Sequence, residues 1–185
     1  MPRELTTLPI NHVRRQDRAV TDDDWIKCLL RRAPVGVLGT AHAGQPFVNS
    51  NLFVYDEPAN AIYLHTHRTG RTRANVEEDG RVCFTVFEMG RLLPAPTALD
   101  FSVEYASAVV FGRAEVVEEA TEATRCLQML LDKYAPHLRP GRDYRAPVPE
   151  ELRLTSVYRV AIDSWSGKRK QVAPDFPGAF RYGEV

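Results

Sequence analysis

Three consecutive polar residues, Arg71, Thr72 and Arg73, form the most distinctive chemical group of the sequence. They follow a glycine and a predicted strand at residues 62–67, and they open a segment with helical spacing. A phosphate is typically held by hydrogen-bond donors, and here these are the free N–H groups of a helix start, a hydroxyl and two guanidinium groups. The helix dipole adds a favourable field for the negative charge. On local sequence alone, the alternative is a solvated helix start.

Two histidines, His65 and His67, lie just before this group in a predicted strand. Side chains two residues apart on a strand project from the same face. A metal site would need a third ligand, and no Cys, Asp or Glu stands at a convincing spacing, so no metal is predicted. A histidine at this place could instead hydrogen-bond a ligand or transfer a proton.

Further polar residues occur in apolar surroundings. Residues 49–51 place amide and hydroxyl groups inside a run, 47–55, that otherwise resembles a core strand. Such groups are either paired within the sheet or offered to a ligand, and both readings stay open. Near the C-terminus, Trp165 precedes a basic run at residues 168–170. Taken alone, that segment indicates a core aromatic residue followed by a solvated end.

Helices and strands must position these groups. Helices are expected over residues 22–32, 71–78 and 118–134, with Thr21 capping the first. A bulge is expected at Gly112. Six strands are expected, at residues 35–41, 47–55, 62–67, 81–87, 102–117 and 156–165.

This pattern predicts a mainly β (α+β) fold, a six-stranded antiparallel barrel with a few peripheral helices. At 185 residues the chain is expected to form a single domain, residues 1–185, with an N-terminal arm at 1–20 and a C-terminal tail at 171–185.

The overall composition narrows the classes of function. The chain has 24 Lys and Arg against 24 Asp and Glu, so the formal net charge is zero and no nucleic-acid partner is predicted. Apolar runs of about 18 residues do not occur, which argues against a membrane protein. The three cysteines are widely spaced and odd in number, as in buried, reduced thiols of a cytoplasmic protein.

Five motifs, taken in order from about Pro9 to Lys170, resemble those of the flavoproteins related to pyridoxamine 5′-phosphate oxidase. The branch they resemble most is the nitroimidazole-resistance group. The motifs are Arg14–Arg18, the strand Ala61–His67 leading to Gly70 and Arg71, Arg81–Phe84, Phe111–Glu115 and Trp165–Lys170.

The resemblance implies a six-stranded split barrel that binds FMN across a homodimer interface. It also gives each candidate residue a role. Arg71, Thr72 and Arg73 are implied to contact the phosphate, and His65 and Thr66 to lie along the ribityl chain and ring. The flavin edge is implied to contact Val48, Asn49 and Ser50. The second subunit is implied to contribute Ser107, Trp165 and Lys168.

One position departs from the family pattern. Relatives usually have lysine after the arginine, where this chain has Thr72. Either Arg73 supplies the missing charge, or the affinity for phosphate is reduced. The additional arginine and histidine residues that the oxidase itself uses for its pyridoxal substrate are not matched, so vitamin synthesis is not expected.

The implied activity is that of an oxidoreductase that reduces a small, planar, electron-poor compound. The flavin would carry the electrons, and His65 is expected nearest its reactive face, as a ligand contact or proton donor. Three alternatives remain: the same barrel with a deazaflavin coenzyme, a non-catalytic barrel that binds haem or flavin, and a colourless protein–protein interaction module.

Overall fold

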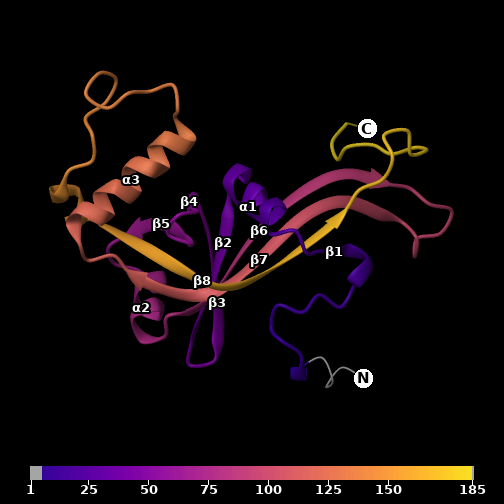
Figure 1. Cartoon of the computed structure of the whole chain (residues 1–185), viewed down its shortest axis with the longest axis horizontal. Helices are drawn as coiled ribbons and strands as arrows, with labels where there is room; N and C mark the ends of the chain where they lie inside the picture. The colour runs from indigo at the N-terminus through magenta and orange to yellow at the C-terminus, as the bar shows by residue number, and fades with distance from the viewer. Residues whose placement is uncertain (1–5, 185) are drawn as a thin grey trace. The chain divides into compact units, whose positions relative to one another are not determined.

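A computed structural model describes residues 6–184, and in this part the chain forms eight β-strands and three α-helices, labelled in Figure 1. The helices are α1 (Asp23–Arg32), α2 (Arg71–Glu78) and α3 (Ala120–Tyr134). The strands are β1 (Ala19–Val20), β2 (Gly36–His42), β3 (Gln45–Asn51), β4 (Phe53–Asp56), β5 (Ala61–His67), β6 (Arg81–Leu93), β7 (Ser102–Val116) and β8 (Thr155–Lys170).

The strands are hydrogen-bonded in the order β3-β2-β6-β7-β8-β5-β4, and β1 pairs with β8. The chain divides into two compact units. Of the described residues, unit 1 contains 6–33, 85–109 and 165–184, and unit 2 contains 34–84 and 110–164. The organisation as a single domain stays a prediction.

The predicted number of six strands is wrong for the described residues, which form eight. The predicted run 47–55 is divided at Leu52 into β3 and β4. The backbone N–H of Phe53 donates to the Tyr134 hydroxyl (3.0 Å), which in turn donates to the Phe53 carbonyl (3.0 Å). Because a side chain from α3 occupies these groups, the ladder with β2 ends at Asn51, and β4 pairs with β5 instead.

Other differences concern strand ends. The two-residue β1 lies within the predicted N-terminal arm, and β6 and β8 extend beyond their predicted ends to Leu93 and Lys170. No bulge interrupts β7 at Gly112. A Cβ at this position would lie 2.0 Å from the carbonyl oxygen of Ala161, so glycine is required here by the close approach of two backbones.

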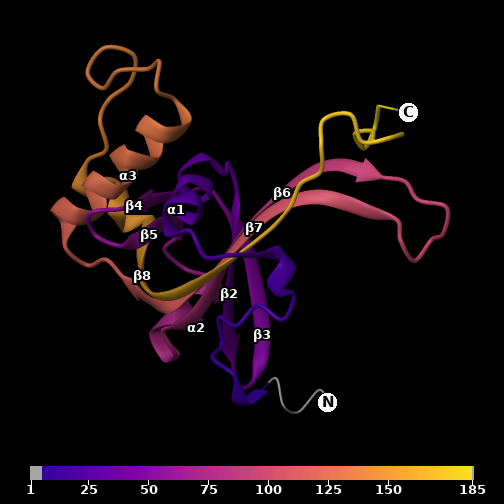
Figure 2. The ribbon, with the colours of Figure 1, turned by 45° about the vertical axis from the view of Figure 1, so that its right-hand side comes forward.

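Unit 2 contains the hairpin of β2 and β3, whose antiparallel register places Leu38 opposite Asn49. Its turn consists of Ala43 and Gly44, both with positive φ (48° and 79°), which is typical of a tight two-residue hairpin turn. Figure 2 shows α2 beside this hairpin, in agreement with its contacts to β2.

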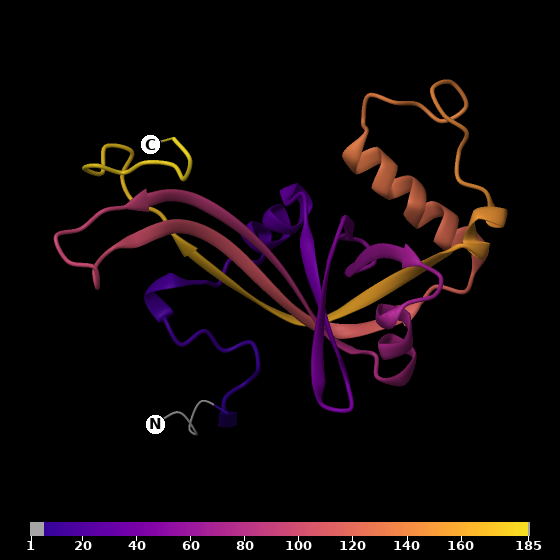
Figure 3. The ribbon, with the colours of Figure 1, turned by 180° about the vertical axis from the view of Figure 1, so that it is seen from behind.

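In unit 2 the helix α3 packs against β4 and β5, and Figure 3 shows this helix in orange. It buries Ala123, Cys126 and Leu130 against Tyr63 and Val157. This apolar cluster fixes β5, the strand that carries His65 and Thr66, between β4 and β8. Burial of such side chains stabilises the fold by about 25 cal/mol per Å² of apolar surface.

Unit 1 contains α1 and the outer part of the β6–β7 pair. The cap of α1 is Asp22 and not the expected Thr21, because the Asp22 carboxylate accepts hydrogen bonds from the N–H groups of Asp24 (2.9 Å) and Trp25 (3.3 Å). One cysteine on this helix, Cys28, is exposed, which corrects the expectation that all three are buried.

A salt bridge joins the two outer strands of unit 1. Arg91 on β6 contacts Glu104 on β7 (2.8 Å) and donates to the carbonyl oxygens of Ala173 and Pro174. The Arg91 guanidinium and the Val172 N–H hold the pKa of Glu104 at about 2, well below its usual value. The chain after β8 is thereby held against the strand pair.

Candidate functional site

The first turn of α2 presents unoccupied hydrogen-bond donors. The first bond of the helix runs from the Ala74 N–H to the Gly70 carbonyl (3.2 Å), so the N–H groups of residues 71–73 have no partner within the helix. Arg71 is exposed, and its guanidinium makes no hydrogen bond or ion pair with any described residue. This helix start therefore offers a free cation and free N–H groups in one place.

Behind Arg71, the side chain of Thr72 points inward and is only 5% exposed. Its hydroxyl oxygen accepts a hydrogen bond from the side-chain amide of Asn49 on β3 (3.4 Å). The same amide also donates to the Oδ1 atom of Asn51 (3.4 Å), and the Asn51 side-chain nitrogen donates to the Asn49 backbone carbonyl (2.8 Å). Two predicted parts of the site, β3 and the start of α2, thus contact each other directly.

Two further polar residues, absent from the predicted site, fix α2 to β2. Asn75 is fully buried and its amide nitrogen donates to the Thr40 hydroxyl (2.9 Å). The Oδ1 atom of Asn75 has no partner among the described residues. The spacing of Thr72 and Asn75, three apart on a helix, places them on one face, but it does not show that this face is buried.

Arg73 differs from Arg71 because its guanidinium is engaged inside unit 2. It contacts Glu77 (2.7 Å), the Ser156 hydroxyl (2.9 Å) and Glu118 (3.2 Å). These hydrogen bonds and nearby carboxylates raise its pKa further, although burial opposes them. Its role in holding phosphate stays a prediction, and few of its donors remain available for one.

The two ring-side candidates on β5 have different surroundings. The Thr66 hydroxyl lies 3.0 Å from the Tyr158 hydroxyl on β8, so this side chain is held within the sheet. His65 is exposed and has no hydrogen-bond partner among the described residues. Partial desolvation of its ring lowers its pKa, which favours the neutral imidazole.

The outer residues of β3 are open to solvent. Val48 is 67% exposed, Ser50 is also exposed, and Asn49 is half-buried. Val48 pairs with Gly39 across the hairpin, where glycine adds no side chain. This stretch of β3 therefore presents backbone and small side chains rather than a closed apolar surface.

The remaining three candidates belong to unit 1. The Trp165 ring nitrogen donates to the Asp23 carboxylate (2.7 Å), the Lys168 ammonium lies 5.9 Å from the centre of the Tyr105 ring, and Ser107 is half-buried on β7. The other eight candidates all lie in unit 2. Among residues 6–184, no three His, Cys, Asp or Glu side chains are grouped as metal ligands.

Comparisons with known proteins agree with this fold. Residues 22–169 match the family model described as pyridoxamine 5′-phosphate oxidase. Among curated proteins, none matches the sequence. The helices in the described part are too short or too polar to cross a lipid bilayer.

Three solved structures are similar to the chain. A flavocytochrome from Azotobacter vinelandii is 24% identical over 95% of this chain and 86% of its own (TM-score 0.76). A FAD and haem binding protein from Mycobacterium smegmatis is 23% identical over 85% and 76% (TM-score 0.73). A protein provisionally named for 5-nitroimidazole antibiotic resistance, from Bacteroides thetaiotaomicron, is 21% identical over 82% and 86% (TM-score 0.68). These similarities confirm the antiparallel split β-barrel class.

Proposed function

The chain belongs to the pyridoxamine 5′-phosphate oxidase family, and from this we propose that it is an FMN-binding flavoprotein. Its activity would be that of an oxidoreductase that reduces a small, planar, electron-poor compound. The observation that carries the proposal is the unpaired Arg71 at the start of α2, beside the contact between Asn49 and Thr72.

The donors at this helix start fit a phosphate. Arg71 offers a guanidinium that no carboxylate of residues 6–184 neutralises, and residues 71–73 offer N–H groups along the positive end of the helix. The Thr72 oxygen accepts from Asn49, which leaves the hydroxyl hydrogen free to donate. We assign the phosphate to Arg71, Thr72 and the helix N–H groups, with Arg73 holding α2 in place through Glu77 and Ser156.

The ring would lie along β3 and β5, near Val48, Asn49, Ser50, His65 and Thr66. When bound, the flavin supplies electron transfer, which no side chain in this set can provide. His65 is open to solvent, and none of the residues that the structure describes competes for its ring nitrogens. Its lowered pKa favours the neutral imidazole, in which one ring nitrogen donates a hydrogen bond and the other accepts one; donating a proton would require the protonated form.

The complete site is proposed to require two copies of the chain. Ser107, Trp165 and Lys168, from unit 1 of a second subunit, would complete the site formed by unit 2 of the first. Exposed apolar side chains on β6, Phe87 and Met89, are the kind of surface that an oligomer covers. The described cysteines are free thiols, which fits the proposed cytoplasmic location.

The proposal is tested by denaturing the purified protein and identifying what is released by absorbance and mass spectrometry. Release of FMN supports it. Release of a deazaflavin or FAD would show that the cofactor is not FMN. A Soret band would indicate haem, which the similar protein from Mycobacterium smegmatis binds. A colourless protein that takes up no FMN on reconstitution would refute the proposal.

A further inference from the structure

A single hydroxyl group, that of Tyr134 at the end of α3, lies at the base of the β2–β3 hairpin. It accepts a hydrogen bond from the Phe53 N–H (3.0 Å), and its own hydrogen lies within reach of two carbonyl oxygens, those of Pro34 (2.9 Å) and Phe53 (3.0 Å). Pro34 precedes β2 and Phe53 follows β3. The hydroxyl therefore connects the two chain segments that enter and leave the hairpin.

The place of this hydroxyl in the strand register is specific. The pairs of the hairpin end at Gly36 and Asn51. Counted from the two-residue turn, this is a hydrogen-bonded pair, and such pairs recur at every second residue of an antiparallel ladder. The next one would be Pro34 and Phe53, in which the Phe53 N–H would donate to the Pro34 carbonyl. The Tyr134 hydroxyl stands in the place of that bond, between the same two groups.

Lys133, the neighbour of Tyr134 on α3, supplies a further donor at this place. A hydroxyl has one hydrogen to donate. The Lys133 ammonium donates to the Phe53 carbonyl (3.0 Å) and lies 3.8 Å from the centre of the Phe53 ring. Because this oxygen has a second donor, the Tyr134 hydrogen is available to the Pro34 carbonyl. The Phe53 N–H and both carbonyl groups at the base of the hairpin thus have partners on α3.

The base of the hairpin is also tightly packed. The Phe53 ring is fully buried, 4.8 Å from the buried ring of Phe84 on β6. A Cβ at Gly36 would lie 2.0 Å from the Cζ atom of Phe84, so the β2 backbone lies directly against that ring. Side chains packed this closely leave little room for a local adjustment. A change in the hydrogen bonds at the base should therefore shift β3 as well.

We propose that Tyr134 is a positioning residue, whose hydroxyl ends the β2–β3 ladder at the point that places Asn49 against Thr72. Asn49 lies two residues before the end of β3, and its amide donates to the Thr72 hydroxyl in the first turn of α2 (3.4 Å). Tyr134 would thus set the flavin edge relative to the phosphate turn. The link to FMN rests on the proposed function, whereas the hold on the hairpin and on the start of α2 does not.

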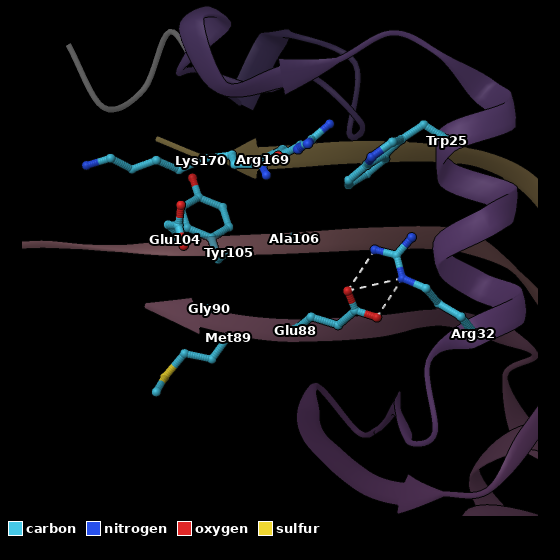
Figure 4. Close-up of a pocket in the computed structure, with 11 residues that line it drawn as sticks. Trp25, Arg32, Glu88, Met89, Gly90, Glu104, Tyr105, Ala106, Arg169 and Lys170 are labelled. Atoms are coloured by element: carbon cyan, nitrogen blue, oxygen red, sulfur yellow. Dashed lines mark hydrogen bonds and ion pairs between the residues drawn. The ribbon is translucent and has the colours of Figure 1, made fainter. Parts of the chain in front are cut away.

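The first measurement is amide hydrogen exchange of the cofactor-free full chain, read by mass spectrometry. Tyr134→Phe keeps the ring and removes the hydroxyl, so exchange in residues 36–51 and 71–78 should become roughly two- to tenfold faster, the factor that corresponds to one lost hydrogen bond. The outer part of β7 in unit 1, where Glu104 and Tyr105 lie (Figure 4), is the internal reference and should exchange as in the wild type.

The second measurement is FMN binding, followed by fluorescence quenching. Tyr134→Phe should bind FMN roughly two- to tenfold more weakly, and the visible circular dichroism of the bound flavin should change, because β3 no longer has the same place relative to α2. Lys133→Met removes the second donor to the Phe53 carbonyl and should change both measurements in the same direction. This variant provides the test if Tyr134→Phe does not fold, which thermal unfolding shows.

Tyr144→Phe is the matched control. Its hydroxyl also bonds to α3, where it accepts from the Gln128 amide (2.7 Å), but Tyr144 lies in the loop after this helix and not at the hairpin. The variant should leave both the exchange of residues 36–51 and the affinity for FMN unchanged.

The proposal is overturned if Tyr134→Phe, or Lys133→Met where the first does not fold, leaves the exchange of the hairpin unchanged. It is also overturned if exchange becomes faster without weaker FMN binding, or if Tyr144→Phe has the same effects. A wild-type chain that does not bind FMN would refute the proposed function instead. Exchange in residues 36–51 and 71–78 would then still decide whether the Tyr134 hydroxyl holds the hairpin against α2.

Discussion

The side-chain amide of Asn49 lies 3.4 Å from the hydroxyl oxygen of Thr72. Asn49 stands on the strand assigned to the flavin edge, and Thr72 stands in the helix turn assigned to the phosphate. The hydrogen bond sets the position of one part of the proposed site relative to the other. Changes at either residue should therefore affect both the stability of unit 2 and the binding of a cofactor.

Replacing Arg71 by alanine should weaken FMN binding by roughly ten- to more than a hundredfold. One charge-assisted hydrogen bond contributes about 1.5–3 kcal/mol, and about 1.4 kcal/mol corresponds to a factor of ten. Because Arg71 is exposed and unpaired, the unfolding free energy should change by less than roughly 0.5 kcal/mol. Fluorescence quenching of FMN gives the affinity, and urea denaturation gives the stability.

Arg113→Ala is the control for this prediction, because Arg113 is also an exposed arginine of unit 2. It should bind FMN like the wild type. Equal FMN affinities for Arg71→Ala and wild type would remove Arg71 from the phosphate site.

Substituting Thr72 by valine should destabilise the protein by about 1 kcal/mol, because the Asn49 amide loses an acceptor inside a nearly buried contact. Thr72→Ser keeps the hydroxyl and should retain the hydrogen bond. The unfolding free energies of both variants, measured in urea, provide the comparison. If valine and serine have the same effect on stability, the hydroxyl contributes nothing and changed packing explains the result.

His65 should make stability depend on pH in a defined direction. Its pKa in the folded protein is below the ordinary value of 6.5, so the unfolded chain binds the proton more tightly. The contribution of neutral His65 is fully present above about pH 6.5 and is lost as the pH falls through the folded pKa. Urea denaturation of wild type and His65→Gln across this range should show a smaller acid-side loss for the variant. Parallel curves would mean that His65 does not titrate differently on unfolding.

The protein should sediment as a dimer at micromolar concentration. Phe87 and Met89 are 59% and 47% exposed on the same face of β6, and a stable homodimer usually buries more than roughly 2,000 Å². Phe87→Glu should shift the equilibrium towards monomer. Leu138→Glu, in the loop after α3, is the matched control. A wild-type monomer of 20.9 kDa would exclude a site shared between subunits.

Local patterns were sufficient to predict the helix starting at Arg71 and the strand at residues 62–67. Contacts between distant residues were not predictable in this way. The division at Leu52 depends on Tyr134, and the engagement of Arg73 depends on Glu118 and Ser156. The two residues of each pair are too far apart to occur in one short stretch of sequence. The pattern of a single strand therefore cannot show which side chain hydrogen-bonds to its polar groups.

The inward polar face of α2 shows the same limit. Asn75 and Thr40 lie on separate elements, 35 residues apart, and only folding brings their side chains together. A lone asparagine in a helix is ordinarily read as a solvated residue. Asn75 is buried because α2 packs against β2, and the sequence of neither segment shows this packing by itself.

The chain after β8 also protects a strand edge. Phe180 exchanges two backbone hydrogen bonds with Leu92 on β6, at 2.7 and 3.2 Å. An exposed edge offers such N–H and C=O groups to any passing strand, which is a common origin of aggregation. Pro174 and Pro177 precede Phe180 in this segment, and each lacks the N–H that a further ladder bond would need. The segment after β8 therefore covers this edge of β6 without forming a further exposed strand edge. Variants in which the segment detaches from β6 should be more prone to self-association by strand addition.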